Sequence, residues 1–269
     1  MKVFFENKHN NKKIVAISCH TAPIAKIAAK YSDILLVGDT VGMIIYGHKD
    51  TKSVTMDMMI NHGQAVKNAA NDTNYVIIDM PFGSYENDKH KALINAKRLL
   101  NETGADAVKL EGGVDIKEVL THLKNNDIPV VGHIGLLPQQ IGEGQNYRVQ
   151  GKIESQKLKI QADLDLLLEL DIKLVVIECV YKDFADELIK DKDAVFIGIG
   201  ASNNCDGQIL VADDIIGLSY ELKLPKFSKS YLDATKLYQE AFAHYAQDIA
   251  EQKFPSVNNL YLKKTDAKS

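Results

Sequence analysis

Short apolar runs rich in β-branched residues alternate along the chain with longer stretches in which apolar residues recur at helical spacing. This alternation is typical of βαβ units, in which helices join parallel strands. It predicts strands at residues 14–18, 34–37, 75–79, 107–110, 129–132, 173–177 and 195–199. An eighth strand is expected within residues 206–218, although that stretch can equally begin as a helix.

The segments between these strands have helical patterns. Helices are predicted at residues 23–31, 55–71, 88–103, 116–125, 153–170 and 184–190. Gly104 stands where a left-handed residue commonly ends a helix. A (β/α)8 barrel takes about 250 residues, and this chain has 269. We therefore expect an α/β fold, a single (β/α)8 TIM barrel over residues 1–269 that ends in a helical segment at about 229–252.

Five of the apolar runs lead directly to ionisable residues. These residues are Asp39, Asp79, Lys109 with Glu111, His133 and Glu178. In a parallel barrel, catalytic groups converge on one rim from the carboxyl ends of several strands. Because the pattern recurs on five strands, we interpret these residues as the active site of an enzyme.

Asp39 and Asp79 are candidate metal ligands. Neither has a Cys or His at zinc spacing, and a hard cation such as Mg²⁺ typically takes one or two carboxylates with waters and substrate oxygens. Each aspartate has another explanation, Asp39 as a turn residue and Asp79 as the start of the loop before Pro81. Together on neighbouring strand ends, they predict a metal site.

Lys109 and Glu111 lie two residues apart, so they share one face of a strand. Lys109 can bind a substrate carboxylate or stabilise enolate charge. Glu111 can hold that lysine or reach a metal through water, and a structural ion pair is the alternative for both. Glu178 ends an apolar run, and a carboxylate partly removed from water is a stronger base, although a supporting role is also open. His133 can donate to a substrate oxygen or be structural. Cys179 is expected on the opposite strand face, where it packs.

These groups suit chemistry on a small 2-oxo acid. A divalent cation held by the carboxylate and keto oxygens of such an acid weakens the neighbouring C–H bond and stabilises the enolate. Glu178 is then the base that takes the proton. The residues therefore predict metal-assisted carbon–carbon chemistry.

The longest predicted loop, residues 135–152, follows His133 and contains four glycines. Long βα loops on this face of a barrel often act as lids. We interpret the loop as a lid, with a surface insertion as the alternative.

Composition and charge limit the classes of partner that this protein is expected to bind. The net charge of -4 argues against nucleic acid and anionic membranes as partners. The three cysteines are far apart and form no CxxC pair. With no signal-peptide pattern at the start and no apolar run of about 18 residues, a cytoplasmic location is expected.

At these same residues the chain resembles the ketopantoate hydroxymethyltransferase (3-methyl-2-oxobutanoate hydroxymethyltransferase) family. The matching stretches follow the family's order from about residue 35 to 227. They are residues 36–43 with 47–48, 79–82, 108–113, 132–136 with 138–139, 147–151, 178–180, 197–201, 206–211 and 225–227.

The resemblance implies a barrel of the phosphoenolpyruvate/pyruvate type, assembled as a homo-oligomer that is commonly a decamer. It implies transfer of a hydroxymethyl group from 5,10-methylenetetrahydrofolate to 3-methyl-2-oxobutanoate, through a Mg²⁺-stabilised enolate. The product, 2-dehydropantoate, leads to pantothenate. The implied partners are thus a small 2-oxo acid and a folate, with Mg²⁺ as cofactor.

Carried over to this sequence, the resemblance assigns roles to the rim residues. The implied magnesium site consists of Asp39 and Asp79, with Glu111 close to the metal. The implied contacts to the oxo acid are Asp39, Thr40, Asp79, Lys109 and His133. Glu178 is the implied catalytic base.

Several positions depart from the family's pattern, among them Leu137 and Ser202, where the family usually has threonine and glycine. The first-strand motif, usually Thr-Ala-Tyr-Asp, reads Ser18-Cys19-His20-Thr21. Thr40 stands where the family usually has serine, and it still offers a hydroxyl. The metal and base residues are unchanged.

Two rival functions remain open. One is a magnesium-dependent lyase or mutase on the same barrel, similar to the isocitrate lyase group. Those enzymes commonly carry a catalytic cysteine in a Lys-Cys-Gly-His-type loop, which this sequence lacks. The other is a catalytically silent barrel, which loss of the metal carboxylates or of Glu178 would have favoured.

Overall fold

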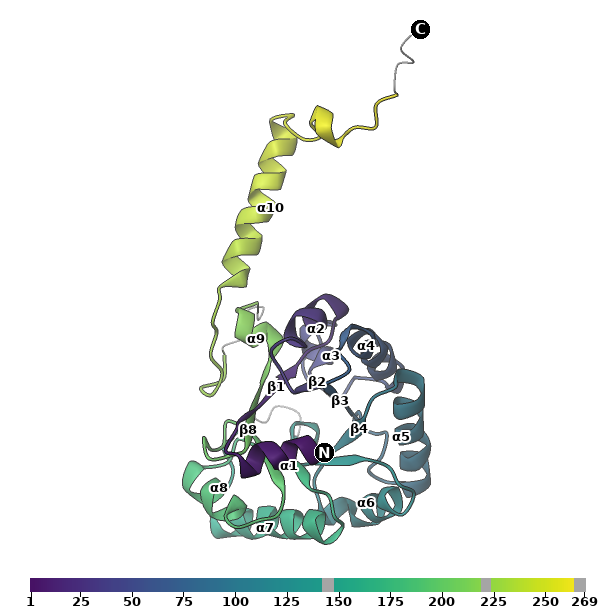
Figure 1. Cartoon of the computed structure of the whole chain (residues 1–269), viewed down its shortest axis with the longest axis vertical. Coiled ribbons are helices and arrows are strands. Elements are labelled where there is room, and N and C mark those ends of the chain that lie inside the picture. Colours follow the sequence, from purple (N-terminus) through teal and green to yellow (C-terminus); the bar gives the residue numbers. More distant parts are fainter. Residues whose placement is uncertain (142–147, 219–223, 264–269) are drawn as a thin grey trace.

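Eight parallel strands close into a barrel in the order in which they occur along the chain. Figure 1 shows the computed structural model, which describes residues 1–141, 148–218 and 224–263. The strands are β1 (Ile14–Ser18), β2 (Ile34–Val37), β3 (Tyr75–Asp79), β4 (Ala107–Glu111), β5 (Val130–Gly135), β6 (Leu174–Glu178), β7 (Val195–Ile199) and β8 (Gly207–Val211). The predicted barrel is confirmed.

Helices surround the barrel and follow the strands as predicted (Figure 1). They are α2 (Ala22–Ala28), α4 (Met56–Ala69), α5 (Lys89–Thr103), α6 (Lys117–Lys124), α7 (Glu154–Glu169) and α8 (Lys182–Ile189). Side chains begin two of them, since Thr55 accepts from the Met58 amide and Asp88 from the His90 and Lys91 amides. Gly104 ends α5 with φ of 74°, as expected.

The stretch 206–218, predicted as a strand or the start of a helix, contains one of each. β8 comes first, and the short helix α9 (Ala212–Ile216) follows it. Three further short turns are η1 (Val114–Ile116), η2 (Pro138–Gln140) and η3 (Val257–Asn259). The predicted fifth strand was too short, because β5 continues to Gly135 and His133 therefore lies within the strand rather than after it.

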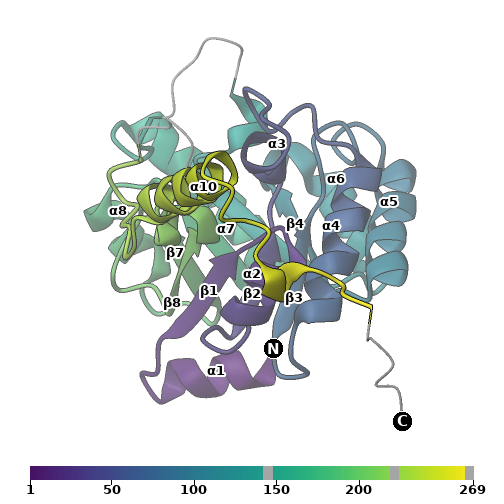
Figure 2. The same cartoon turned by 90° about the horizontal axis from the view of Figure 1, so that it is seen from above.

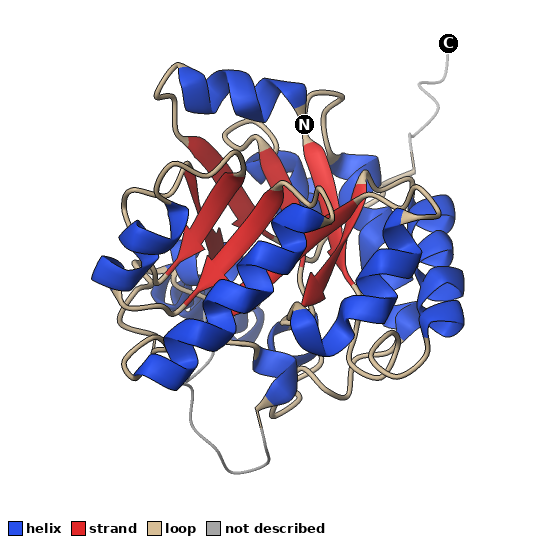
Figure 3. Cartoon of the chain, turned by 90° about the horizontal axis from the view of Figure 1, so that it is seen from below, coloured by secondary structure: helices blue, strands red, loops and turns tan. Residues whose placement is uncertain are grey.

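Two helices were not predicted. The four-residue α3 (Val41–Ile44) is too short to show a periodic pattern. The helix α1 (Lys2–His9) lies across the end of the barrel where the strands begin (Figures 2 and 3). Its Phe4 is buried among inward-facing strand residues and meets the Tyr75 ring edge-on at 5.5 Å between centroids. This contact depends on tertiary structure, so no local pattern predicts it.

The barrel interior explains where the polar groups gather. Alternate residues of a strand point to the same side. The inward-facing residues that come before the rim on each strand are apolar, and they fill the interior of the barrel. They are Ile14, Ala16, Ile34, Leu36, Ile77, Ala107, Val131, Leu174, Val176, Val195, Ile197 and Ile209. Two residues further along four strands stand Asp79, Lys109, His133 and Glu178. The strand period therefore carries these groups onto the carboxyl-end rim.

The C-terminal helix α10 (Ala234–Ala250) is shorter than the predicted segment 229–252 and projects from the barrel (Figure 1). Residues 142–147 of the predicted lid loop lie outside the described residues. None of the helices in the described parts of the chain combines the length and apolar character needed to cross a bilayer.

Candidate active site

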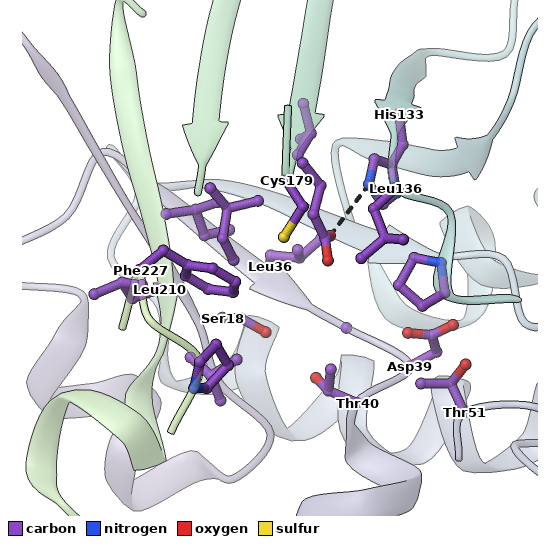
Figure 4. Close-up of a pocket in the computed structure, with 18 of the residues that line it drawn as sticks. Ser18, Leu36, Asp39, Thr40, Thr51, His133, Leu136, Cys179, Leu210 and Phe227 are labelled. Atoms are coloured by element: carbon purple, nitrogen blue, oxygen red, sulfur yellow. Dashed lines mark ion pairs between the residues drawn. The ribbon is translucent and has the colours of Figure 1, made fainter. Parts of the chain in front are cut away.

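A pocket of about 580 Å³ opens at the carboxyl ends of the strands. Its lining includes every predicted site residue; these are Asp39, Thr40, Asp79, Lys109, Glu111, His133 and Glu178. Figure 4 shows Asp39, Thr40 and His133 around this pocket. The tertiary structure thus brings together side chains that are up to 139 positions apart, since residue 39 and residue 178 differ by that number.

Lys109 is the cation at the centre of the buried charges. Its Nζ lies 3.1 Å from Asp79 Oδ1 and 3.1 Å from His133 Nδ1. The prediction that Lys109 and Glu111 share one strand face is confirmed, because both are buried and both line the pocket. Burial lowers the pKa of Lys109, but the nearby charges of Asp79 and Glu111 outweigh it and raise that pKa overall. The surrounding acids therefore favour the protonated, positively charged lysine.

The acidic residues repel one another in this buried site. Burial, followed by the charges of Asp79 and Glu111, raises the pKa of Asp39 to about 7. Burial also raises the pKa of Asp79, although Lys109 opposes the shift. Desolvation and like charge both disfavour ionised carboxylates, so this cluster favours an additional cation.

Asp79 is a buried carboxylate at the end of β3. Its Oδ2 accepts from the Asp39 amide at 3.2 Å. Its Oδ1 is buried and faces Lys109 Nζ at 3.1 Å, so that oxygen is already in an ion pair. Within those residues, no three His, Cys, Asp or Glu side chains form an all-protein metal cage. One or two carboxylates suffice for Mg²⁺, which keeps waters and takes substrate oxygens, so Asp39 and Asp79 fit such an ion.

Glu111 is already engaged on both oxygens. Its Oε2 accepts from the Gln139 amide at 3.0 Å, and its Oε1 lies 3.5 Å from His133 Nδ1. A carboxylate with these partners is better suited to contact a metal through water than to bind it directly.

Gln139 is a site residue to which the sequence analysis assigned no role. Its Nε2 donates to Asp39 Oδ2 at 2.8 Å and to the Met80 carbonyl at 3.0 Å, while Oε1 accepts from Tyr85 at 2.8 Å. Gln139 is buried, and it fixes the positions of the Asp39 and Glu111 carboxylates relative to each other by donating to both. Its place in a matching stretch after Pro138 was the only sequence signal, and Tyr85 had none.

His133 connects this network to Glu178. Its Nε2 lies 3.2 Å from Glu178 Oε2, the ion pair drawn as a dashed line in Figure 4. Burial and Lys109 lower the pKa of His133, but Glu111 and Glu178 outweigh them and raise it to about 9. The Glu178 side chain is 17% exposed, whereas the His133 side chain is 2% exposed. Glu178 is therefore the acid that borders open pocket space.

The expectation that Cys179 faces away from the site was wrong. Cys179 follows the last residue of β6 and has φ of 48°. This left-handed turn breaks the strand alternation, so the cysteine is buried and also lines the pocket (Figure 4).

The altered first-strand motif supplies a partner for Thr40. His20 is buried, and its Nε2 lies 3.1 Å from Thr40 Oγ1. Burial, together with the charge of His62, lowers the pKa of His20 to about 4. A neutral imidazole thus orients the Thr40 hydroxyl at the pocket wall, and Ser18 lines the same pocket.

Replacing Gln139 by leucine is expected to lower the free energy of unfolding by about 1–3 kcal/mol, the cost of leaving buried polar partners unsatisfied. Asp39 and Tyr85 lose their partners, while the side-chain volume is nearly kept. Urea unfolding measures the change. The matched control is Gln140→Leu at the exposed neighbouring position, with an expected change within about 0.5 kcal/mol. Equal effects of the two variants would contradict the assigned role of Gln139.

Solved structures with similar folds share little sequence with this chain. A phosphonopyruvate hydrolase, in complex with oxalate and Mg²⁺, superposes with a TM-score of 0.61 at 11% identity and covers 96% of this chain and 92% of its own. A 2,3-dimethylmalate lyase of the PEP mutase/isocitrate lyase superfamily gives a TM-score of 0.52 at 12% identity, covering 98% and 90%. At such identities the likeness concerns the fold alone, and it agrees with the predicted (β/α)8 barrel.

Sequence relatives are much closer. The sequence model for ketopantoate hydroxymethyltransferase matches residues 1–257. The 3-methyl-2-oxobutanoate hydroxymethyltransferase of Rhizobium etli is 44% identical over 250 residues, covering 93% of this chain and 91% of the relative. That of Anaplasma marginale is 42% identical over 254 residues, covering 94% and 90%. The chain therefore belongs to the ketopantoate hydroxymethyltransferase family of enzymes.

Proposed function

We propose that this enzyme transfers a hydroxymethyl group from 5,10-methylenetetrahydrofolate to 3-methyl-2-oxobutanoate and so forms 2-dehydropantoate. The observation that carries the proposal is Glu178, a partly exposed acid bordering the same pocket as the buried group of Asp39, Asp79 and Lys109. Relatives at 42–44% identity have the corresponding hydroxymethyltransferase name. The overall transfer consumes a water molecule, whose oxygen becomes the new hydroxyl group.

We propose Mg²⁺ as the cofactor, held by Asp39 and Asp79 with Glu111 contacting it through water. Support comes from the two buried carboxylates of Asp39 and Asp79 at neighbouring strand ends and from the mutual repulsion of the acids. The phosphonopyruvate hydrolase with a similar fold was solved with Mg²⁺ and oxalate, a small dicarboxylate. Bound Mg²⁺ would supply Lewis-acid stabilisation for the charge that develops on the keto oxygen.

The protein's own residues would perform the proton transfer and hold the oxo acid. Lys109 places a positive charge beside Asp79 and so favours the negatively charged end of the substrate. Thr40, oriented by His20, offers a hydroxyl to the substrate. Glu178 would take the proton from C3, and His133 would hold the Glu178 carboxylate in position through the contact at 3.2 Å. The electron pair left on C3 then forms the new bond to the donor's methylene carbon, whose two bonds to nitrogen break as the oxygen of water becomes its hydroxyl group and tetrahydrofolate leaves.

The test is deuterium exchange at C3 of 3-methyl-2-oxobutanoate, followed by NMR with and without Mg²⁺, and then addition of methylenetetrahydrofolate. We expect exchange that disappears with EDTA and returns with Mg²⁺, and 2-dehydropantoate once the folate is added. Exchange without product would remove the folate donor from the proposal. An absence of exchange in the Mg²⁺-loaded protein would remove the mechanism.

We also propose that the chain forms a homo-oligomer, for which the resemblance implies a decamer. Of the residues of α10, only Ala234 is buried. The helix exposes a stripe of apolar side chains, namely Leu237, Tyr238, Phe242, Tyr245 and Ile249. Exposed apolar patches of this kind mark interaction surfaces. The barrel wall is also incompletely covered, because no helix lies in the described residues between β7 and β8. Val15 on the adjacent β1 is 45% exposed, and a second copy of the chain can cover this apolar surface.

Phe242→Glu is expected to dissociate the oligomer, because it places a charge in the middle of the apolar stripe. Light scattering of the intact chain after size exclusion measures the molar mass. Ala243→Glu puts the same charge on the opposite face of the same helix by helical spacing, and it should leave the mass unchanged. A monomeric parent chain, or equal masses for the parent and Phe242→Glu, would contradict the proposal.

The proposal includes no nucleic-acid or membrane partner. The described cysteines Cys19, Cys179 and Cys205 are all unpaired and buried. Free thiols are the usual state in a reducing compartment, which supports the proposed cytoplasmic location.

A further inference from the structure

The pocket has a second side, which consists of apolar residues. Leu210 and Val211 at the end of β8 line it together with Phe227. We call these three residues the apolar side. In Figure 4, Phe227 and Leu210 lie across the pocket from Asp39 and Leu136, and the Phe227 ring points into the cavity. The buried charges therefore occupy only one part of the pocket.

The size of the pocket exceeds what a small oxo acid needs. A volume of about 580 Å³ lies within the range of about 300–1,000 Å³ found for pockets that enclose drug-sized ligands. The five-carbon substrate of the proposed function would fill only the part next to Lys109 and Asp79. The remaining walls are largely apolar, with Arg148, Asp214 and Lys226 as further charged residues of the lining, which suits a larger ligand that combines a flat ring with polar groups.

Phe227 is held in place by a close backbone contact. A Cβ atom on Gly200 would lie 2.6 Å from Cδ1 and 2.9 Å from Cγ of the Phe227 ring, and Gly200 has φ of 61°. Only glycine leaves room for the ring at this point and adopts this backbone conformation without strain. The loop after β7 thus supports one side of the ring, and the ring lines the pocket beyond it.

The folate donor has chemistry that fits the apolar side. Its pterin is a flat heteroaromatic ring, and such rings stack on aromatic side chains in offset or edge-to-face arrangements. The methylene carbon must also reach C3 of the oxo acid, whose carboxylate and keto oxygens are directed toward the charged residues. The donor therefore has to approach from the part of the pocket that lacks those charges.

We propose that the apolar side is the subsite for the pterin ring of the reduced folate, with Phe227 as the stacking residue. This inference rests on the proposed function and deepens it. Phe227 contacts the co-substrate in this arrangement and takes no part in deprotonating the oxo acid. The two half-reactions therefore depend on different residues of one pocket.

The test compares Phe227→Ala, Phe227→Leu and Phe227→Tyr in the intact, Mg²⁺-loaded chain. Stacking on one aromatic side chain corresponds to a change of about tenfold to a hundredfold in affinity. We expect KM for methylenetetrahydrofolate to rise by about that factor in the Ala and Leu variants. Calorimetric titration with tetrahydrofolate should show the same weakening. Tyrosine keeps the ring and should restore both values, whereas leucine keeps only apolar volume.

Deuterium exchange at C3, measured without folate, shows whether the variants still fold and bind the oxo acid. Unchanged exchange with weakened folate binding supports the subsite. Unchanged folate binding in Phe227→Ala overturns the subsite and leaves the proposed function standing. A loss of C3 exchange equal to the loss of transfer also overturns the subsite, because the variant has then lost more than folate binding. If the parent chain itself gives no exchange, the proposed function fails and the subsite fails with it.

Discussion

Glu178→Gln is expected to slow deuterium exchange at C3 of 3-methyl-2-oxobutanoate by about 10²–10⁴-fold, the usual contribution of a positioned general base. The amide keeps the shape of the side chain but cannot take a proton. Among the charged residues at the rim, Glu178 is the acid with an exposed edge, since its side chain is 17% exposed and those of Asp79 and Glu111 are 4% and 3% exposed. Removing the base should therefore stop the chemistry while leaving the buried network in place.

A matched control makes this result specific. Glu187 lies on α8, the helix that follows β6, and is exposed. Glu187→Gln removes the same charge close in sequence and should leave the exchange rate unchanged. NMR of the substrate measures both variants, and thermal unfolding checks that each is folded. If Glu178→Gln exchanges C3 at the parent rate, Glu178 is not the base and the proposed mechanism is wrong.

Gly135→Ala is expected to destabilise the enzyme by more than about 3 kcal/mol, which is above the usual range for single substitutions. Gly135 ends β5 with φ of 97°, and an added Cβ would lie 2.3 Å from the backbone oxygen of Glu178. That oxygen also accepts from the Leu136 amide at 2.8 Å. The backbone of β6 must therefore shift, and Glu178 shifts with it. We expect the loss of most C3 exchange activity together with the loss of stability.

The control for Gly135→Ala is Gly47→Ala. Gly47 also has a positive φ, 67°, but an added Cβ would meet nothing within 4 Å. Its expected cost is the backbone term alone, about 1–2 kcal/mol. Thermal unfolding of the two variants separates strain from steric overlap: a fall in Tm of about 2–4 °C per kcal/mol is typical for a chain of this size. A Gly135→Ala variant as stable as Gly47→Ala would show that β5 and β6 separate easily.

Much of the barrel could be predicted from local sequence. Strands such as β2, β3 and β7 are continuous apolar runs, and fully buried parallel strands favour such runs. Helix ends were visible too, because capping side chains and left-handed residues such as Thr55, Asp88 and Gly104 act within a few positions. The rim residues could be identified because each stands directly after an apolar run, at the point where a buried strand is expected to end.

The contacts across the pocket could not be predicted in this way. Gln139 bridges Asp39 and the Met80 carbonyl over long sequence separations, and no local pattern encodes such a pairing. The orientation predicted for Cys179 from strand alternation was wrong, because a single residue with positive φ changes which way a side chain points. The pairing of His20 with Thr40 likewise depends on how β1 and β2 align.

The sequence by itself determined the type of barrel, the family and the set of chemical groups at the rim, because strand period, helix signals and family motifs are properties of consecutive residues. Only the tertiary structure decided how those groups act on one another. The pairing of β3 with β4 and of β4 with β5 sets the distances among Lys109, Asp79 and His133. Burial then sets their charges, since removal from water changes a group's pKa by an amount that depends on its surroundings in three dimensions.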